Sequence, residues 1–498
     1  MMNERTFTTR ARQGLRSSDD KSPTVSRTSP SVPTAGTLGE KLDTVGACAI
    51  LPIRPPRRPP DGRICNRVRG LDQETPMIAP PATGIRRRGI VAAALGCAAA
   101  LTIAGCSSDS SSTASSSSAS AVPSSGAAGP TSQGADVITP VNATAVDDPI
   151  PVIGSDGDTH LAYELLLTNV TPDPVAIRSL EVSAGGQSLL TLQGPTLTAL
   201  TRRGSGAPGL DLAGGEYARL TLDVVVPEGA STPTSLSNTL TVAPSKPQPP
   251  LIPAVIAEPI TVTVSQQKAL LVDTPLYGDG WLNGDGCCGT SAHRMAANPI
   301  NGRFWLAERF AIDWVRLDSA GKLYVGDPAS LSSYAYYGDD IHSVADSTVV
   351  GVVDGLPDQV PGTSPTGLQL DQYGGNHVVA KVADGVFVFY AHLKPGSVRV
   401  KVGDKLSPGQ VVGLLGNSGN SDAPHLHFHA MDGPDPLRAS GIPYEFKQFT
   451  VAHRLRSEDQ LDQLITTGGP VPYAAEPVDK KVTDAMPMDL DVVNFPSN

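Results

Sequence analysis

Three of the nine histidines in this 498-residue chain, His425, His427 and His429, alternate within the stretch APHLHFHAMDG. In an extended strand successive side chains point to opposite faces, so these three imidazoles would share one face. Imidazole is a common metal ligand and can also act as a general acid or base. The spacing therefore predicts a metal site or a catalytic site on one strand face, with partners from elsewhere in the chain.

The composition favours β structure around this site. Charged residues make up only 17% of the chain, while glycine and proline contribute 50 and 45 residues. In residues 137–265, short Val-, Leu- and Thr-rich runs separated by turn formers predict a β-sandwich of immunoglobulin-like architecture. Nothing in these runs suggests chemistry, so we interpret this part as a spacer or binding module. Residues 266–455 again consist of short strands with glycine-rich turns, and residues 456–498 are expected to form an extended C-terminal tail. One short helix is compatible with SEDQLDQL at the start of that tail. The fold class is therefore mainly β, with at least two domains.

A targeting segment precedes the β-rich part. The basic cluster RRR at 86–88 is followed by an uncharged, Ala-rich run at 89–105 and then by Cys106, which is the order of a secretory signal. The tetrad IAGC that ends at Cys106 resembles a bacterial lipobox, in which the cysteine is lipidated, and two acyl chains suffice for stable anchoring. We expect residues 77–106 to be a lipoprotein signal peptide. The protein would then be extracytoplasmic and lipid-anchored to the outer face of the bacterial cell membrane. The alternative is an ordinary signal peptide with an incidental cysteine.

The segments on either side of this signal predict no fold. Residues 1–76 are rich in Pro, Arg and Ser and are expected to be disordered, or to precede a true start at Met77. Serine makes up 12 of the 19 residues at 107–125, so residues 107–136 are expected to form a flexible linker. Residues 1–90 hold 16 Lys and Arg against 8 Asp and Glu, whereas the whole chain carries −11. Because the β-rich part is acidic, we expect no nucleic-acid partner.

Three stretches give the histidine strand a context. HLHF at 425–428 resembles the closing His-x-His strand of the lysostaphin/LytM-type zinc peptidases (metallopeptidase family twenty-three), which cut peptide cross-links in bacterial cell walls. VFVFYAHLKPGSVRVKVGDKLSPGQVVGLLGNSGN at 386–420 resembles the segment and glycine turn that lead into that strand. YYGDDIHSVADSTVVGVVDG at 336–355 resembles the hairpin that opens the sheet. The resemblance covers residues 300–435 and implies a lysostaphin/LytM-type antiparallel β domain at 266–455.

The resemblance also implies the roles of individual residues. His427, the second histidine of His-x-His, would ligate zinc, and Asp313 stands where the family has its aspartate ligand. His392 and His425 would flank the water that zinc acidifies to a pKa of about 7. One of these two imidazoles would take a proton, and the other would donate to the tetrahedral oxyanion.

The sequence departs from the family pattern at Arg309. Strand alternation in FWLAERFAIDWV puts Arg309 and Asp313 on one face, with Arg309 where the family has a histidine ligand. A guanidinium offers no lone pair and repels a divalent cation, so we expect it to pair with Asp313. His293 in TSAHRMAAN is the best candidate for the missing ligand. His429, which stands where the family usually has glutamate, is a second candidate, and a degenerate site with weak or no metal is the third outcome.

Two other pairs of residues receive structural predictions. His342 and His377 are expected to be surface or turn histidines rather than ligands. Cys287 and Cys288 are adjacent in a glycine-rich loop, where an oxidising compartment would allow a vicinal disulfide.

Two functions therefore remain open. The first is a zinc metalloendopeptidase that hydrolyses peptide cross-links of peptidoglycan, with Zn²⁺ as cofactor and peptidoglycan peptides as partners. The second, motivated by Arg309, is a catalytically degenerate module that binds cell wall or regulates a partner hydrolase. A generic metal-carrying lipoprotein would explain the histidines but not the YAHL and GNSGN stretches.

Overall fold

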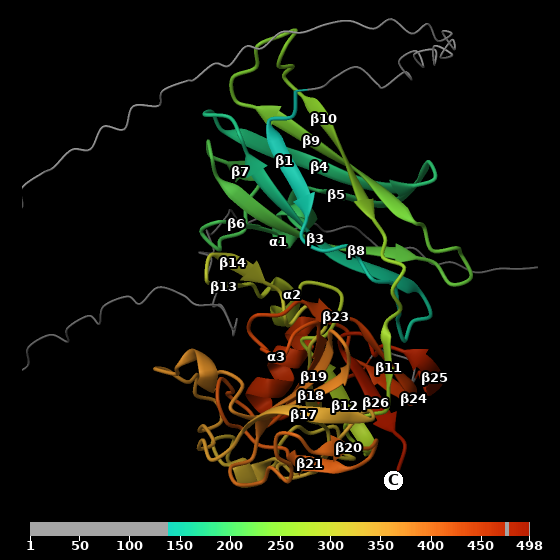
Figure 1. Cartoon of the computed structure of the whole chain (residues 1–498), viewed down its shortest axis with the longest axis vertical. Coiled ribbons are helices and arrows are strands. Elements are labelled where there is room, and N and C mark those ends of the chain that lie inside the picture. Colours follow the sequence, from blue (N-terminus) through green and yellow to red (C-terminus); the bar gives the residue numbers. More distant parts are fainter. Residues whose placement is uncertain (1–137, 474–477, 498) are drawn as a thin grey trace, which may run out of the picture. The chain divides into compact units, whose positions relative to one another are not determined.

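A computed structural model of the chain describes residues 138–473 and 478–497 (Figure 1). The predicted disordered extension, the signal peptide with Cys106 and the serine-rich linker lie outside the described residues. Within the described ranges, none of the helices has the length and apolarity that crossing a membrane requires.

The first part of the described chain consists of two five-stranded antiparallel sheets. Its elements are β1 (Val141–Ala145), β2 (Val152–Ile153), β3 (Thr159–Asn169), β4 (Val175–Ala184), β5 (Gln187–Gln193), α1 (Gly194–Leu200), β6 (Thr201–Arg203), β7 (Asp211–Leu212), β8 (Tyr217–Val226), β9 (Ser235–Pro244) and β10 (Ile256–Thr263). One sheet has the order β1-β3-β8-β6 with β2 on β3, and the other has the order β10-β9-β4-β5 with β7 on β4. Side chains from both sheets share one hydrophobic core. The immunoglobulin-like assignment of this sandwich stays a prediction.

Strand β3 is buried on both faces, unlike a strand at the surface of an isolated sandwich. Leu161, Tyr163 and Leu165 belong to the sandwich core, whereas the intervening Ala162 belongs to the core of the C-terminal part. Glu164, on the same face as Ala162, is only 1% exposed. The sandwich therefore packs against the rest of the chain and is not a free spacer.

The C-terminal part is built on one 12-stranded sheet with the order β11-β24-β26-β12-β15-β22-β19-β18-β17-β20, with β23 on β22 and β25 on β24. The strands are β11 (Leu270–Val272), β12 (Gly278–Gly284), β15 (Ile312–Arg316), β17 (Ser347–Val353), β18 (Asn376–Ala383), β19 (Val386–Leu393), β20 (Lys405–Leu406), β22 (Leu426–Met431), β23 (Gly441–Ile442), β24 (Tyr444–Arg454), β25 (Lys480–Ala485) and β26 (Asp491–Phe495). The remaining elements are α2 (Ala292–Met295), β13 (Asn298–Ile300), β14 (Arg303–Trp305), η1 (Leu331–Ser333), β16 (Asp340–His342), η2 (Leu370–Gln372), β21 (Val411–Leu414) and α3 (Glu458–Thr467).

An aromatic core fixes which face of the central strands looks outward. Leu426 and Phe428 of β22 are fully buried and belong to the large core cluster, next to Trp314 of β15. Trp314 packs edge-on against Phe495 with ring centroids 5.2 Å apart. Because side chains alternate, the histidines of β22 must lie on the opposite face.

Within the tail at 456–498, the short helix is present as α3 at residues 458–467, but the prediction that the chain after it is merely extended was wrong for its described residues. Residues 480–485 and 491–495 form β25 and β26, which pair with β24 and β12. The physical reason is that the apolar side chains of DVVNF are needed to complete the aromatic core, where Phe495 is 3% exposed. The domain thus extends to the end of the described residues.

The sandwich holds a buried carboxyl group that makes its stability depend on pH. Glu258 on β10 is 2% exposed; its Oε1 accepts a hydrogen bond from the Val141 N–H, and its Oε2 has no partner among the described residues. Burial raises the pKa of Glu258 to about 7, although the bond from Val141 opposes this rise. Because the folded pKa lies above the ordinary value, this group's stability contribution is complete near pH 4.5 and is lost as the pH rises through 7.

We expect ionisation of Glu258 to lower the unfolding free energy by about 2 kcal/mol between pH 5 and pH 8. In Glu258→Gln this part of the pH dependence should be absent, since the amide keeps the acceptor for Val141 but carries no charge. Urea unfolding at both pH values measures the difference. Glu181→Gln, at an exposed position on β4, is the matched control. An equal pH slope in wild type and Glu258→Gln would contradict the assignment.

Candidate metal centre

The centre of the site is a direct pair across two neighbouring strands. Strand β22 lies between β15 and β19, and its His427 is the register partner of Asp313 on one side and Ala391 on the other. The His427 Nδ1 lies 2.9 Å from the Asp313 Oδ1. Sheet register therefore brings together two residues that lie 114 positions apart in the sequence.

His293 reaches this pair from outside the sheet. It lies in α2, a one-turn helix in the connection between β12 and β15. Its Nδ1 lies 2.9 Å from the carbonyl oxygen of Asp285 and 3.2 Å from that of Ala311, which fixes the ring orientation. Its Nε2 then points inward, 3.5 Å from the Asp313 Oδ1.

The donor set of His293, Asp313 and His427 fits a zinc ion. Ligand atoms of the three residues all lie within 4.8 Å of one another. Zinc in proteins is usually tetrahedral with Zn–N distances of about 2.0–2.1 Å, which places neighbouring ligand atoms about 3.3 Å apart. The observed separations of 2.9 and 3.5 Å from Asp313 bracket that value. Two imidazoles and one carboxylate are also ligand types that zinc accepts.

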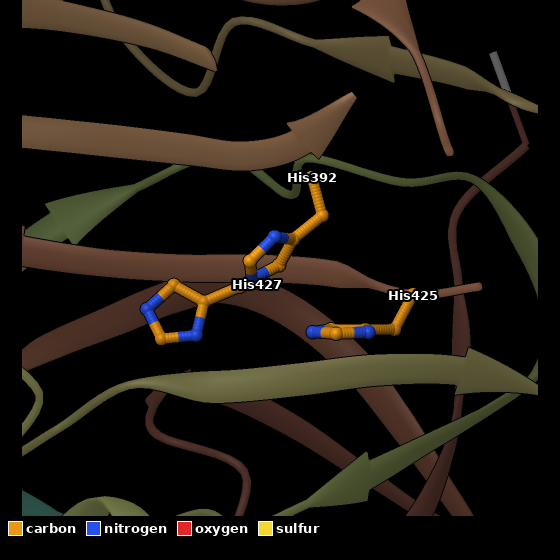
Figure 2. Close-up of side chains that lie close together, drawn as sticks. All are labelled: His392, His425 and His427. Atoms are coloured by element: carbon orange, nitrogen blue, oxygen red, sulfur yellow. The ribbon is translucent and has the colours of Figure 1, made fainter. Parts of the chain in front are cut away.

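His392 and His425 also lie next to His427, and the His425 Nε2 is 3.4 Å from the Asp313 Oδ1. Figure 2 shows the three imidazoles converging, and their ring nitrogens form a second group within 4.8 Å. His392 lies at the end of β19 with a φ of 61°, a left-handed conformation that is uncommon outside glycine. Such strained residues cluster at functional sites. The structure thus brings together the five residues that the sequence predicted as ligands or catalytic groups.

Backbone carbonyls fix the tautomers of both flanking histidines. The His392 Nδ1 donates to the carbonyl oxygen of Ser418 at 2.7 Å, so its Nε2 carries a lone pair. The His425 Nδ1 lies 2.8 Å from the carbonyl oxygen of Ala423, and its Nε2 lies 3.4 Å from the Asp313 carboxylate. The two rings therefore present their Nε2 atoms to the centre.

The two flanking histidines differ in charge. Burial lowers the pKa of His392 well below its ordinary value, and repulsion from His425 and His427 lowers it further. Burial also lowers the pKa of His425, but the Asp313 carboxylate outweighs this effect and raises it to about 9. Conversely, burial would raise the pKa of Asp313, but His425 and His293 hold it well below its ordinary value. In the metal-free chain at neutral pH, His392 is therefore neutral and His425 is cationic.

The glycine turn GNSGN makes the contact to His392 possible. Gly419 has a φ of 78°, and a Cβ at this position would lie 2.2 Å from the backbone nitrogen of Gly375. Only glycine allows this close approach of two backbone segments. The approach places the Ser418 carbonyl, one residue earlier, next to the His392 ring.

His429 lies behind His427 rather than in the ligand group. Its Nδ1 is 2.9 Å from the His427 Nε2, the nitrogen that faces away from Asp313. When the His427 Nδ1 holds a metal, its Nε2 would carry the proton and donate to His429. The structure therefore gives His429 an orienting position and does not support it as the missing ligand. Orienting partners of this kind are usual for ligating histidines.

The expected contact between Arg309 and Asp313 was wrong. Residues 307–310 form a turn between β14 and β15, so strand alternation does not extend to Arg309. Its guanidinium instead binds the carboxylates of Glu164 and Asp147, which precede the C-terminal part by more than a hundred residues. The sequence gives one signal for this contact: Glu164 is a lone acid in the apolar run LAYELLL.

The described histidines and cysteines that were not expected to bind metal, His342, His377, Cys287 and Cys288, lie outside the ligand group. His342 packs against Tyr277, and His377 packs against Phe389 while its Nδ1 faces the carbonyl oxygen of Gly375. Cys287 and Cys288 form the vicinal disulfide that the sequence suggested.

Comparison with known proteins agrees with the resemblance seen in the sequence. Residues 331–438 match the model of Peptidase family M23, and the C-terminal part therefore contains a Peptidase M23 domain. The matched range includes His392, His425 and His427 but begins after His293 and Asp313.

Several curated proteins are similar to this domain. Glycyl-glycine endopeptidase ALE-1 from Staphylococcus capitis is 32% identical over 120 residues, which cover 24% of this chain and 30% of that protein. Peptidoglycan DD-endopeptidase ShyA from Vibrio cholerae is 33% identical over 102 residues, 19% of this chain and 22% of that protein. The chain thus spans less than a third of the length of these relatives.

A solved structure gives a weaker likeness. The catalytic domain of the prophage-encoded M23 protein EnpA from Enterococcus faecalis is 22% identical, with a TM-score of 0.21, over 34% of this chain and 93% of that one. At this TM-score the likeness supports no argument of its own.

Removing any one ligand should release the metal. We expect His293→Ala, Asp313→Asn and His427→Ala each to reduce bound zinc from about one ion per chain to near zero, because three protein ligands are the minimum in catalytic zinc sites. Mass spectrometry of the dialysed protein measures the zinc. His453→Ala is the control, since His453 stacks on Tyr473 outside the ligand group. Full zinc retention in Asp313→Asn would contradict the assignment.

The orienting role of His429 has its own test. We expect His429→Ala to weaken zinc binding about 10- to 100-fold, as loss of an orienting partner usually does. His429→Glu should bind zinc at least as tightly as wild type, because a carboxylate also accepts the proton of the His427 Nε2. Competition with a chelator measures both affinities. If His429→Ala binds zinc as tightly as wild type, the residue has no orienting role.

Proposed function

We propose that the chain is a zinc metalloendopeptidase that hydrolyses peptide cross-links of bacterial peptidoglycan. The observation that carries the proposal is the convergence of His293, Asp313 and His427 at ligand distances beside the pair His392 and His425. The match to Peptidase family M23 supports it, as do relatives named as glycyl-glycine and peptidoglycan endopeptidases.

The proposed mechanism divides the work between the two flanking histidines. Zinc in such a site supplies Lewis acidity, which polarises a carbonyl group and makes water more acidic. His392, neutral and with a lone pair on Nε2, is suited to take a proton from the attacking water. His425, in its protonated form and with its Nε2 directed at the centre, would stabilise the negative charge that develops on the peptide oxygen.

The surroundings of the centre suit an extended peptide. The site opens into a cleft whose walls include Tyr373, Phe389, Leu437 and Glu308. Apolar walls with a few polar groups fix the orientation of a bound ligand. The lining supports a peptide substrate but does not select one cross-link.

The structure also bears on the alternative function, a catalytically degenerate module. A degenerate module was motivated by Arg309 at an expected ligand position. Arg309 instead binds Glu164, and His293 stands at ligand distance from Asp313. No observation on the described residues now favours the binding or regulatory module over the enzyme.

We further propose that the enzyme works outside the cytoplasm, anchored by a lipid on Cys106. The supporting observation is the basic cluster, apolar run and IAGC tetrad at residues 86–106. Peptidoglycan lies on the same side of the membrane, so substrate and anchor are consistent.

Substitution of either flanking histidine should reduce activity without removing the metal. We expect His392→Ala and His425→Ala to keep zinc but to release muropeptides from purified walls about 10²- to 10⁴-fold more slowly, because each removes one proton-transfer or charge-stabilising group. His427→Ala should lose both zinc and activity. His453→Ala should retain both and serves as control. Wild-type release by His392→Ala would sink the mechanism, and a zinc-loaded wild type without any release would sink the proposed activity.

A further inference from the structure

Two of the three proposed ligands are fixed by the sheet, and the third is not. Asp313 and His427 are register partners on adjacent strands. His293 lies on a helix of only four residues within the long connection 285–311. A helix this short is not stable on its own, so its position depends on tertiary contacts.

The sandwich supplies contacts on both sides of this connection. Arg294, the residue after His293, donates from Nη1 to the Glu164 Oε1 at 2.6 Å. Arg309, four residues before Asp313, donates from Nε to the Glu164 Oε2 at 2.9 Å. One carboxylate on β3 therefore holds the connection at a point next to each of two ligands.

A second strand of the same sheet holds the backbone of α2. Arg219 on β8 donates to the carbonyl oxygens of Arg294 and Met295. The Arg294 Nη2 donates in turn to the carbonyl oxygen of Leu222 on β8 at 3.0 Å. Both the side chains and the main chain of α2 are thus bound to the sandwich.

The contacts between Glu164 and the two arginines are buried, so each charge needs a partner of opposite sign. Glu164 and Arg294 are each 1% exposed, and Arg309 is 6% exposed. Burial alone would raise the pKa of the Glu164 carboxyl, but Arg309 and Arg294 outweigh it and lower the pKa to about 2. The carboxylate therefore stays charged, and removing its charge would leave the buried Arg294 guanidinium without its carboxylate partner, whereas Arg309 would keep Asp147.

We propose that Glu164 is a positioning residue of the metal centre, and that the sandwich, through Glu164, holds His293 at ligand distance from Asp313. The inference rests on the proposed metal site. It gives the sandwich a role beyond that of a spacer or separate binding module, because the third ligand is in place only when β3 and β8 are docked against α2.

The experiment compares full chains carrying Glu164→Gln with a matched control, Glu258→Gln. Both positions are buried glutamates of the sandwich, but Glu258 lies on β10 and contacts Val141 rather than α2. Co²⁺ is the probe, since its visible absorption reports the number and geometry of its ligands as well as its affinity. Thermal unfolding of each variant separates a change of site geometry from a loss of fold.

We expect Glu164→Gln to bind Co²⁺ about tenfold more weakly, with an altered visible spectrum, because loss of an outer partner typically weakens binding 10- to 100-fold. Glu258→Gln should match wild type in affinity and spectrum. Wild-type affinity and spectrum in Glu164→Gln would overturn the inference, as would an equal loss in Glu258→Gln. A wild type that binds no Co²⁺ would instead overturn the metal site itself.

A conservative variant covers the case in which Glu164→Gln does not fold. Arg294→Lys keeps a cation opposite Glu164 but cannot also reach the carbonyl oxygen of Leu222 as a planar guanidinium does. We expect a folded chain with an altered Co²⁺ spectrum and binding roughly fivefold weaker, smaller than the usual loss of an orienting partner. Unchanged spectrum and affinity in Arg294→Lys would overturn the inference.

Discussion

The pairing of Asp313 with His427 across β15 and β22 is the constraint on which the site depends. It requires that both side chains leave the sheet on the same face, and the aromatic core ensures this. Phe428 and Trp314, each the next residue along its strand, are fully buried on the opposite face. A slip of one residue in either strand would move an aromatic ring into the site and a charge into the core. The hydrophobic pattern of the sheet thus specifies the geometry of the centre.

The Asp313 carboxylate also affects the pKa values of the two flanking histidines differently. His425, 3.4 Å from the Asp313 carboxylate, has a pKa raised to about 9, whereas His392, bonded to a neutral carbonyl, has a pKa well below its ordinary value. The asymmetry comes from the surroundings of each ring: the Asp313 carboxylate raises the pKa of His425, whereas burial and the neighbouring imidazoles of His425 and His427 lower the pKa of His392. The glycine turn at Gly419 places the Ser418 carbonyl that fixes the orientation of the His392 ring.

Local pattern and resemblance were sufficient for the parts of the site that belong to regular strands. Alternation placed His425, His427 and His429 on one face, and the resemblance to known motifs identified His392 and Asp313. The same reasoning failed at residues 304–313, because it assumed one continuous strand where the chain makes a turn. The strands at 480–495 were missed for a related reason: they are short, and only the distant aromatic core shows what their apolar residues pack against.

The position of His293 could not be derived from local sequence because it depends on a contact between residues 130 positions apart, Arg294 and Glu164. Burial of this charged group costs desolvation free energy, and removing one partner of such a buried pair typically costs about 3–5 kcal/mol. Well-packed apolar residues would fill the same space with a similar or greater gain in stability. Stability alone therefore does not account for charges at this position. Unlike apolar side chains, guanidinium groups bind a carboxylate in a fixed direction. The guanidinium groups on Glu164 therefore fix the position of α2 relative to the sheet that carries Asp313 and His427. The proposed metal centre needs that position, since His293 is the one proposed ligand that the sheet does not carry.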